Sequence, residues 1–216
     1  MTLHAREELI ATARRMSELG LAPGTSGNVS VRTAQGFLVT PSGMSYDGLR
    51  GDDAVEVKAD GTLRPNQRAP STEWQLHRDI LARRPDTHAI VHTHSMFCTT
   101  LSMLRRPIPA VHYTVVLAGT DEIPCADYAT FGSPELAQSV VRALGAGLAC
   151  LMANHGMVAL GPTLPAALRL AAEVETLAAQ YWHALQLGSP HILDRDELLR
   201  VRHRFASSWG QKKPGR

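Results

Sequence analysis

The chain has 216 residues, of which 44% are hydrophobic and 19% are charged, so one compact domain with its own core is expected. Its 22 basic and 20 acidic residues give a formal net charge of only +2, which argues against nucleic acid or an anionic membrane surface as a partner. Three widely spaced cysteines without a CxxC pair, and the lack of a secretory or membrane-spanning apolar run, favour the cytoplasm. We expect a single domain over residues 1–210 and a flexible basic tail over 211–216.

Helical and strand patterns alternate along the chain. Helices are predicted where apolar residues recur at helical spacing between capping signals, and strands where short alternating or β-branched runs lie between turns. The predicted helices cover 3–19, 71–82, 95–104, 133–144 and 164–187, and the predicted strands cover 29–32, 36–40, 54–57, 89–94, 111–117, 122–125 and 149–153. This order predicts a single α/β domain in which helices cover a mixed sheet, an α/β/α arrangement.

Two glycine turns near the first predicted strands carry groups that suit an anion. One turn, 24–28, reads Gly-Thr-Ser-Gly-Asn and ends at Asn28, and the other contains Ser42 and Gly43. Their hydroxyl, amide and backbone N–H groups are donors of the kind that bind phosphate. Neither turn matches a GxxxxGK[ST] or GxGxxG motif, so a nucleotide site is not indicated. Each turn taken alone is also explained by the turn geometry that glycine permits.

The next candidate residues open the second predicted helix, at Ser71, Thr72 and Glu73. A hydroxyl residue there is expected to cap the helix. Glu73 has two interpretations, because a carboxylate in a first helical turn can simply complement the helix dipole or can serve as a general base beside a metal. The hydroxyls of Ser71 and Thr72 favour the second interpretation, since helix N-termini bind phosphate.

Three histidines form a candidate metal site. His92 and His94 are two residues apart in a predicted strand and therefore present their imidazoles on the same face. His155 follows the apolar strand 149–153, where a side chain can project into a shared cleft. Together the three match the open three-ligand site of catalytic zinc. Imidazole also binds cobalt, manganese and iron, so zinc, one ion per subunit, is a prediction that needs a test.

Tyr113 follows His112 in the strand predicted after Pro109. Its phenol can be a proton donor or the side chain of a core edge, and the spacing does not decide between them. Cys98, four residues beyond His94, is interpreted as a small buried hydrophobe and is left out of the site.

From Glu7 to about Trp209 the chain resembles the class II aldolase and adducin family. The resemblance is carried by segments that share the order and nearly the spacing of the family. They are 24–32, 40–43, 70–74, 91–94, 108–113, 123–132 and 154–156. It implies a three-layer α/β/α fold with a mixed, largely antiparallel central sheet. It also implies a fourfold-symmetric homotetramer with active sites at the subunit interfaces.

The resemblance assigns roles to the candidate residues. In the family, the residues that match His92, His94 and His155 bind zinc, and the match to Glu73 ligates the resting metal and then acts as acid and base. The match to Tyr113 reaches a neighbouring subunit's site and protonates the aldehyde oxygen. The substrate phosphate is held by the matches to Asn28, Ser42, Gly43, Ser71 and Thr72.

The implied function is that of a zinc-dependent lyase. It would cleave a ketose 1-phosphate, such as L-fuculose 1-phosphate or a related deoxysugar phosphate, to dihydroxyacetone phosphate and an aldehyde. One departure concerns Trp209, which stands where the family has a tyrosine near its C-terminal end. Since that tail covers the aldehyde end of the substrate in the family, the departure leaves the aldehyde open.

Other functions remain in competition. Pentulose-phosphate 4-epimerases, methylthioribulose-1-phosphate dehydratases and 3-oxo-tetronate 4-phosphate decarboxylases share the metal and phosphate sites. Glu73 disfavours the epimerases, which resemble this pattern with an aspartate there, and leaves the other two open. An adducin-like interaction module would need no metal, so the retained set of ligands favours an enzyme.

Overall fold

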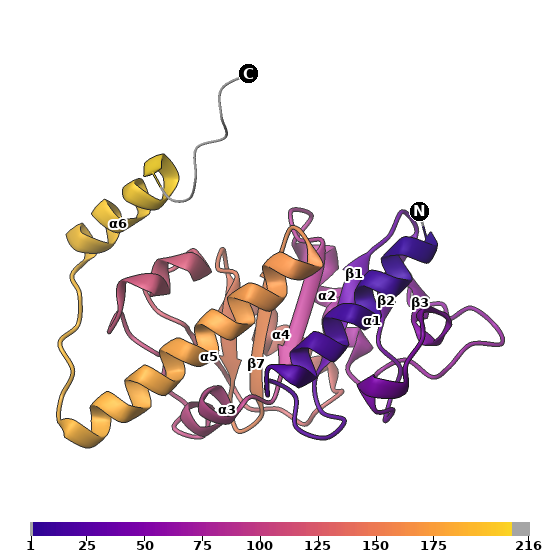
Figure 1. Cartoon of the computed structure of the whole chain (residues 1–216), viewed down its shortest axis with the longest axis horizontal. Coiled ribbons are helices and arrows are strands. Elements are labelled where there is room, and N and C mark those ends of the chain that lie inside the picture. The colour runs from indigo at the N-terminus through magenta and orange to yellow at the C-terminus, as the bar shows by residue number, and fades with distance from the viewer. Residues whose placement is uncertain (1, 209–216) are drawn as a thin grey trace.

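The computed structural model describes residues 2–208 and shows a seven-stranded sheet with helices on both faces (Figure 1). The helices are α1 (Thr2–Glu18), α2 (Trp74–Arg83), α3 (Met96–Ser102), α4 (Pro134–Leu144), α5 (Leu164–Leu187) and α6 (Arg195–Ser208). The strands are β1 (Asn28–Arg32), β2 (Gly36–Val39), β3 (Val55–Lys58), β4 (Ala89–Thr93), β5 (Cys125–Ala126), β6 (Ala149–Met152) and β7 (Gly156–Gly161). Short 3-10 helices lie at η1 (Tyr46–Gly48), η2 (Gly51–Asp53) and η3 (Tyr113–Ala118).

The sheet is mixed and largely antiparallel, as predicted. Its strand order is β3-β2-β1-β4-β7-β6-β5, and every neighbouring pair is antiparallel except β5 and β6. Strand β4 lies in the middle, between β1 and β7. Its register places Asn28 of β1 and Val158 of β7 directly opposite His92. The central strand therefore brings a histidine and an amide side by side.

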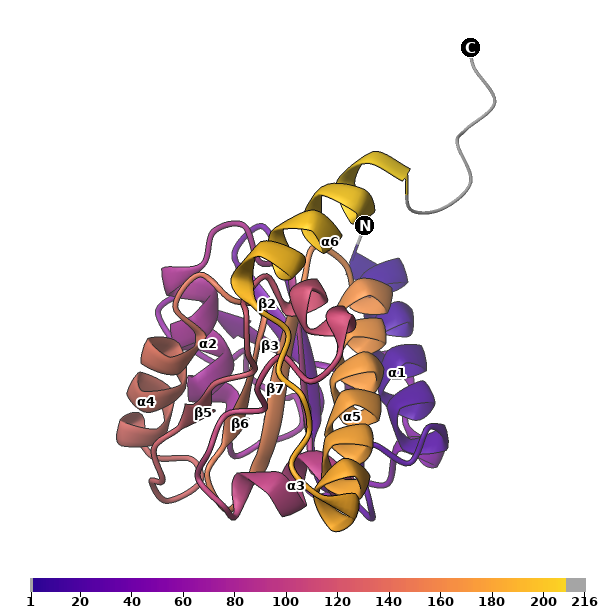
Figure 2. The same cartoon turned by 90° about the vertical axis from the view of Figure 1, so that its left-hand side faces the viewer.

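Figure 2 shows the three layers, with α1 and α5 on one face of the sheet and α2 and α4 on the other. Successive side chains of a strand point to opposite faces. Accordingly Val91 packs in the core under α1 and α5, whereas Ile90 packs in the core under α2 and α4. His92, two residues beyond Ile90, therefore faces the layer that contains α2. Glu73 lies in the same layer, at the start of α2.

Two helices begin with the hydroxyl caps that their start signals predict. Ser133 accepts a hydrogen bond from the N–H of Leu136, and Thr163 accepts one from the N–H of Ala166. The predicted hydroxyl cap of α2 is wrong, because Glu73 occupies the N-cap position and no side chain caps the helix. Ser71 Oγ instead accepts from the N–H of Glu73. The Glu73 side chain turns away from its own helix and toward the histidines.

The strand predicted over 111–117 is also wrong. The structure has the 3-10 helix η3 there, with Val115, Val116 and Ala118 buried. These residues pack against α5, and such tertiary contacts outweigh the strand preference of β-branched side chains. The strand predicted over 122–125 is shorter and later, and becomes β5.

Two elements of the structure have no counterpart in the prediction, namely β7 and α6. Strand β7 follows His155 and occupies a central place in the sheet. Helix α6 begins where Asp194 accepts a hydrogen bond from the N–H of Glu197, with Asp196 and Glu197 in its first turn. It packs against η3, as the position of α6 in Figure 2 shows.

Within residues 2–208, no helix is both long and apolar enough to cross a lipid bilayer. Trp209 and the predicted basic tail over 211–216 lie outside the described residues. The domain limits therefore stay a prediction.

Candidate metal centre and active site

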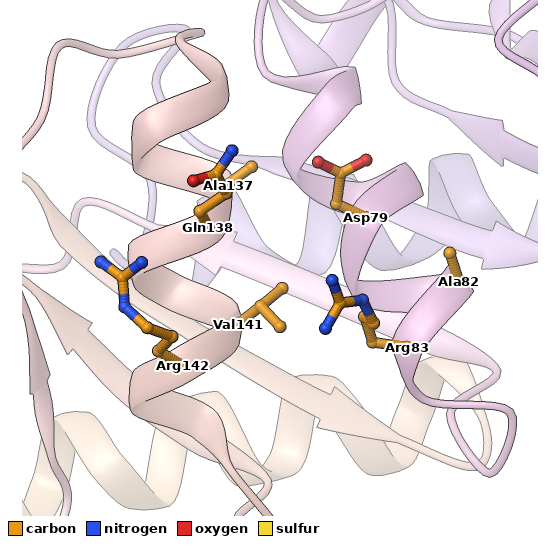
Figure 3. A pocket seen from close by; sticks show the side chains of 7 residues that line it. All are labelled: Asp79, Ala82, Arg83, Ala137, Gln138, Val141 and Arg142. Atoms are coloured by element: carbon orange, nitrogen blue, oxygen red, sulfur yellow. The ribbon is translucent and has the colours of Figure 1, made fainter.

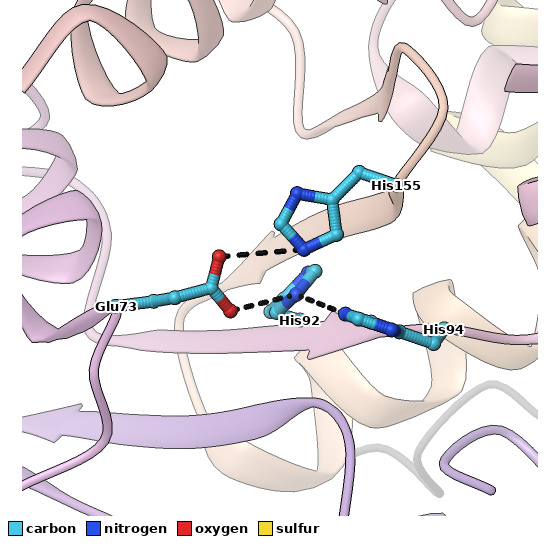
Figure 4. Close-up of side chains that lie close together, drawn as sticks. All are labelled: Glu73, His92, His94 and His155. Carbon is cyan, nitrogen blue, oxygen red and sulfur yellow. Dashed lines mark hydrogen bonds and ion pairs between the residues drawn. The ribbon is translucent and has the colours of Figure 1, made fainter. Parts of the chain in front are cut away.

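Four predicted ligands converge at one point (Figure 4), Glu73, His92, His94 and His155. One ligand atom from each lies within 4.8 Å of the others. Glu73 Oε2 is 3.1 Å from His92 Nε2, and Glu73 Oε1 is 3.4 Å from His155 Nε2. The Nε2 atoms of His92 and His94 are 3.0 Å apart. His94 lies one residue beyond the end of β4 and not within the strand as predicted, yet its imidazole is beside that of His92, as their spacing predicts.

Two glycines, Gly27 just before β1 and Gly156 at the start of β7, allow the backbone to approach the end of β4 closely. A Cβ on Gly27 would lie 2.6 Å from the carbonyl oxygen of His92, and Gly27 has a φ of +74°. A Cβ on Gly156 would lie 2.2 Å from the carbonyl oxygen of Thr93. Any side chain at either position would push the neighbouring strand away from β4. Gly27 and Gly156 therefore allow the segments that carry them to lie against the end of β4, next to His92 and His94.

His155 sits in the tight turn between β6 and β7. Asn154 has a φ of +55°, and the N–H of His155 donates to the carbonyl oxygen of Met152 at 3.0 Å. The backbone N–H of Asn154 donates to the carbonyl oxygen of Ser102 at 3.3 Å. This turn is thereby attached to the end of α3, which fixes where the His155 imidazole projects.

His94 is supported from the opposite layer. Glu175 of α5 accepts hydrogen bonds from Ser95 Oγ at 2.7 Å, from the N–H of Phe97 at 2.8 Å and from the N–H of Cys98 at 2.9 Å. The carboxylate satisfies N–H groups that the start of α3 leaves without a partner. Because α3 begins two residues after His94, Glu175 anchors the chain that carries this imidazole. Cys98 is fully buried, which agrees with its predicted role as a small hydrophobe.

The charges of the cluster are coupled. Burial raises the pKa of Glu73, but the opposing effects of His92, His155 and Asn28 are larger and hold that pKa well below its usual range. Burial lowers the pKa of His92, but the Glu73 carboxylate outweighs burial and raises it. Burial, helped by the charge of His92, lowers the pKa of His94 to about 3 and that of His155 to about 4. His94 and His155 are therefore neutral at pH 7, which is the state that binds a metal.

The donor set fits a divalent metal. His92 Nδ1 donates to the carbonyl oxygen of Met157 at 2.9 Å, so its Nε2 lone pair is oriented toward the cluster. Glu73 Oε1 is buried and has no hydrogen-bond partner among the described residues. A tetrahedron with zinc–ligand bonds of about 2.1 Å has edges of about 3.4 Å. Three separations, from 3.0 to 3.4 Å, are close to those edges, and all four ligand atoms lie within 4.8 Å of one another.

The metal ligands and the predicted phosphate residues share one cavity of about 290 Å³. Its lining comprises Thr25, Ser26, Gly27, Asn28, Pro41, Ser42, Gly43, Ser71, Thr72, Glu73, His94, Phe131 and His155. The three segments that sequence analysis singled out as anion-binding candidates therefore meet at one place, beside the metal ligands. His92 lies beneath this surface and is fully buried.

Phe131 is a residue of this cavity that sequence reasoning missed. Its ring is 65% exposed although it lines the cleft. It lies in the segment 123–132, which carries part of the family resemblance, but an isolated phenylalanine in a loop gives no chemical signal of its own. An exposed aromatic ring beside polar groups supplies an apolar wall for a substrate.

A larger groove of about 490 Å³ lies between α2 and α4 (Figure 3). Arg83 and Arg142 line it with Asp79 and short side chains, and none of the four metal-site residues does. Its polar groups come from exposed helix faces and do not converge. The smaller cavity is the better candidate site, because the residues able to carry out chemistry gather there.

Tyr113 does not line the cavity of its own chain. It stands at the start of η3 and is 42% exposed. The His112 ring stacks on it at 4.4 Å between centroids, and the Phe205 ring of α6 lies 6.2 Å away. The structure therefore separates this predicted catalytic residue from the other candidates within one chain.

Known proteins of one family are similar to this chain in sequence and in structure. Residues 7–182 match the family model described as Class II Aldolase and Adducin N-terminal domain. The chain is 50% identical over 200 residues to 5-methylthioribulose-1-phosphate/5-deoxyribulose-1-phosphate aldolase of Rhodospirillum rubrum, covering 93% of this chain and 90% of the relative. It is 46% identical over 182 residues to L-fuculose phosphate aldolase of Haemophilus influenzae, covering 84% of each.

A solved structure named L-fuculose 1-phosphate aldolase superposes with a TM-score of 0.90 and 34% identity, covering 94% of this chain and 96% of that chain. The fold, the family model and the relatives thus agree with the resemblance seen in the sequence. The chain belongs to the class II aldolase and adducin family.

Proposed function

We propose that the chain is a zinc-dependent aldolase that cleaves a ketose 1-phosphate to dihydroxyacetone phosphate and an aldehyde. The observation that carries the proposal is the single cavity that joins Glu73 and the histidines to the phosphate candidates. In a ketose 1-phosphate, the ketone carbon is bonded to the carbon that bears the phosphate. A metal site and a phosphate site must therefore adjoin, as they do here.

His92, His94 and His155 would hold the metal, and Glu73 would ligate it in the resting state. When bound, the metal supplies a Lewis acid that polarises the ketone and the adjacent hydroxyl. In cleavage, the bond between C3 and C4 breaks and its electron pair stays on C3, which takes a proton from Glu73. As the aldehyde forms, the hydroxyl on C4 loses its proton to solvent through the Tyr113 phenol of a neighbouring subunit. Glu73, which is ionised in the resting site, takes up from solvent the proton that it gives to C3, so no proton is gained or lost overall.

The substrate phosphate would be bound at the other end of the cavity. Asn28 and Ser71 are buried at its base, and Thr72 is exposed at its rim. Ser42 and Gly43 face them from the turn after β2. Ser71 and Thr72 also precede the N-terminus of α2, whose dipole favours a negative charge. These groups offer hydroxyl, amide and backbone N–H donors to the phosphate oxygens.

We assign Tyr113 to the site of a neighbouring subunit, where its phenol would exchange the proton of the aldehyde oxygen. Its exposure, and the fact that it does not line the cavity of its own chain, support this assignment. The arrangement requires an oligomer, and the proposed one is a homotetramer with sites between subunits. Free thiols at Cys98, Cys125 and Cys150 support the proposed cytoplasmic location.

The two relatives named above differ in the sugar phosphate in their names. One is named for 5-methylthioribulose 1-phosphate and 5-deoxyribulose 1-phosphate, and the other for L-fuculose phosphate. The higher identity to the first makes its two sugars the first substrates to test. The exposed ring of Phe131 suits a substrate whose far end is apolar.

The test is an assay of the zinc-loaded protein with these three ketose 1-phosphates, in which released dihydroxyacetone phosphate is reduced by a coupling dehydrogenase. We expect dihydroxyacetone phosphate from at least one of them and loss of the signal after chelation. Two other outcomes would replace the proposal. Water loss from 5-methylthioribulose 1-phosphate would indicate a dehydratase, and carbon dioxide from 3-oxo-tetronate 4-phosphate would indicate a decarboxylase. A chain that binds no metal would be an interaction module.

A further inference from the structure

Behind the metal centre lies a histidine that no step of the proposed reaction uses. His77 is on α2, one turn after Glu73, and is fully buried. Its Nδ1 is 2.6 Å from Ser30 Oγ, and its Nε2 is hydrogen-bonded to Asn28 Oδ1. Asn28 Nδ2 in turn donates to Glu73 Oε2 at 3.1 Å. Four side chains thus form one continuous buried chain that ends at a metal ligand.

The carboxylate at the end of this chain determines the direction of every hydrogen bond. Asn28 Nδ2 donates to Glu73 Oε2, so the NH2 group of the amide faces the carboxylate and the amide oxygen faces His77. Asn28 Oδ1 then accepts from His77, which requires a hydrogen on Nε2. Burial lowers the pKa of His77 to about 3, so the ring is neutral and carries a single N–H. Its Nδ1 is therefore an acceptor, and the Ser30 hydroxyl donates to it.

We propose that His77 is a positioning residue that fixes the side-chain amide of Asn28, so that its NH2 group and not its oxygen faces Glu73 and the phosphate end of the cavity. The oxygen and the NH2 group of an asparagine amide have nearly the same size and shape, so packing alone does not select between the two orientations of the amide. A reversed amide would place an oxygen against the carboxylate and offer an acceptor to the phosphate. The Nε2–H of His77 prevents this reversal. The inference rests on the proposed phosphate-binding role of Asn28.

Two substitutions of His77 separate this role from simple space filling. His77→Met keeps a similar volume but removes the donor to Asn28. His77→Gln can place an amide N–H near the position of Nε2 and so retain a donor. Each variant, loaded with zinc, is compared with the wild type by the inhibition constant of inorganic phosphate, by kcat and KM for a cleaved ketose 1-phosphate, and by zinc content.

We expect His77→Met to weaken phosphate binding and raise KM about tenfold, because Asn28 loses its fixed orientation. Zinc content should stay at the wild-type level, and His77→Gln should recover most of the phosphate affinity. If His77 only fills space, both variants lose stability while the inhibition constant stays unchanged, and this result would overturn the proposal. An inhibition constant raised equally by both variants would also overturn it, because the retained donor would then not matter.

A spectroscopic test on the wild type does not depend on how the variants fold. Nitrogen-15 NMR of histidine-labelled protein distinguishes a protonated from an unprotonated ring nitrogen. The proposal predicts that His77 is neutral with hydrogen on Nε2 from pH 6 to 8. The His77 signal is identified because it disappears in His77→Gln and shifts in Ser30→Ala. Hydrogen on Nδ1 would reverse the Asn28 amide and refute the proposal. Failure of the wild type to cleave any ketose 1-phosphate would instead refute the proposed function, while this tautomer could still be observed.

Discussion

The metal centre and the Tyr113 region differ in how completely a single chain builds them. Glu73, His92 and Asn28 are buried and linked by hydrogen bonds to the sheet and to α2. Tyr113 is partly exposed, and its ring lies near the rings of His112 beside it and Phe205 on α6. One half of the proposed site is therefore fixed within the chain. In the proposed function the other half depends on Tyr113 of a second chain, and the predictions below disturb each half in turn.

The largest effect is expected from the centre. His92→Ala removes a ligand that is fully buried and held by Met157. We expect loss of bound zinc and a fall of kcat/KM by at least about a thousandfold, because one ligand is lost from a catalytic metal site. Elemental analysis and the coupled assay measure both. His88→Ala, an exposed histidine just before β4, is the control and should retain metal and activity. Full activity in His92→Ala would refute the assigned site.

A smaller effect is expected from the Tyr113 region. Tyr113→Phe removes only the phenolic hydroxyl, so kcat should fall by about a hundredfold while zinc content is unchanged. Tyr181→Phe on α5 is the matched control and should behave as the wild type. Simultaneous loss of metal in Tyr113→Phe would contradict the separation of the two regions.

Mixing two defective variants tests whether the halves come from different chains. Glu73→Gln and Tyr113→Phe chains are unfolded together and refolded in equal amounts. If each site takes Glu73 from one subunit and Tyr113 from another, about a quarter of the sites in random mixtures regain both groups. The coupled assay should then show activity well above that of either variant alone. Activity no greater than the average of the two variants would place both groups on the same chain.

The buried layer behind the centre should respond to acid. The pKa of His77 falls from 6.5 to about 3 on folding. Between these values the unfolded chain binds a proton that the folded chain does not, so His77 lowers stability as pH falls, by up to about 1.4 kcal/mol per pH unit. At pH 7 His77→Gln should be less stable than the wild type, and by pH 5 this gap should narrow by about 2 kcal/mol. The free energies of unfolding of the two proteins are measured by urea unfolding at pH 7 and pH 5, at fixed protein concentration and in the presence of a chelator. A gap that does not change with pH would contradict the burial of a neutral His77.

The smallest effect concerns the support of His94. Glu175→Gln keeps the shape of the side chain but weakens the hydrogen bonds to Phe97 and Cys98 at the start of α3. We expect a loss of about 1 to 2 kcal/mol in unfolding free energy, since bonds to a charged acceptor are stronger than neutral ones. Metal affinity should fall only slightly. Glu173→Gln on the same helix is the control, and an equal loss there would indicate a general charge effect.

Much of the metal centre could be predicted from the sequence, because its signals are local. Two histidines at strand spacing and a third after an apolar strand require only the alternation of side chains. The role of His77 could not be predicted in this way, since its partners Ser30 and Asn28 lie more than 40 residues earlier in the chain. A usable signal was its place one helical turn after Glu73.

The errors in the predicted fold have two different origins. The segment 111–117 has the composition of a strand, but contacts with α5 turn it into η3. Strand β7 was missed although its apolar run lies between Gly156 and Gly161. Helix α6 was missed although Asp194 precedes two acidic residues, a common start signal. The first error needed tertiary information, whereas the other two signals are present in the sequence.

The most direct test of the central claim is the metal content of the purified wild-type protein, measured by elemental analysis after exposure to zinc and removal of the excess. The account predicts about one zinc ion per chain, because four ligand atoms of described residues converge at one point. A chain that retains no divalent metal under these conditions would contradict the metal centre and, with it, the proposed aldolase.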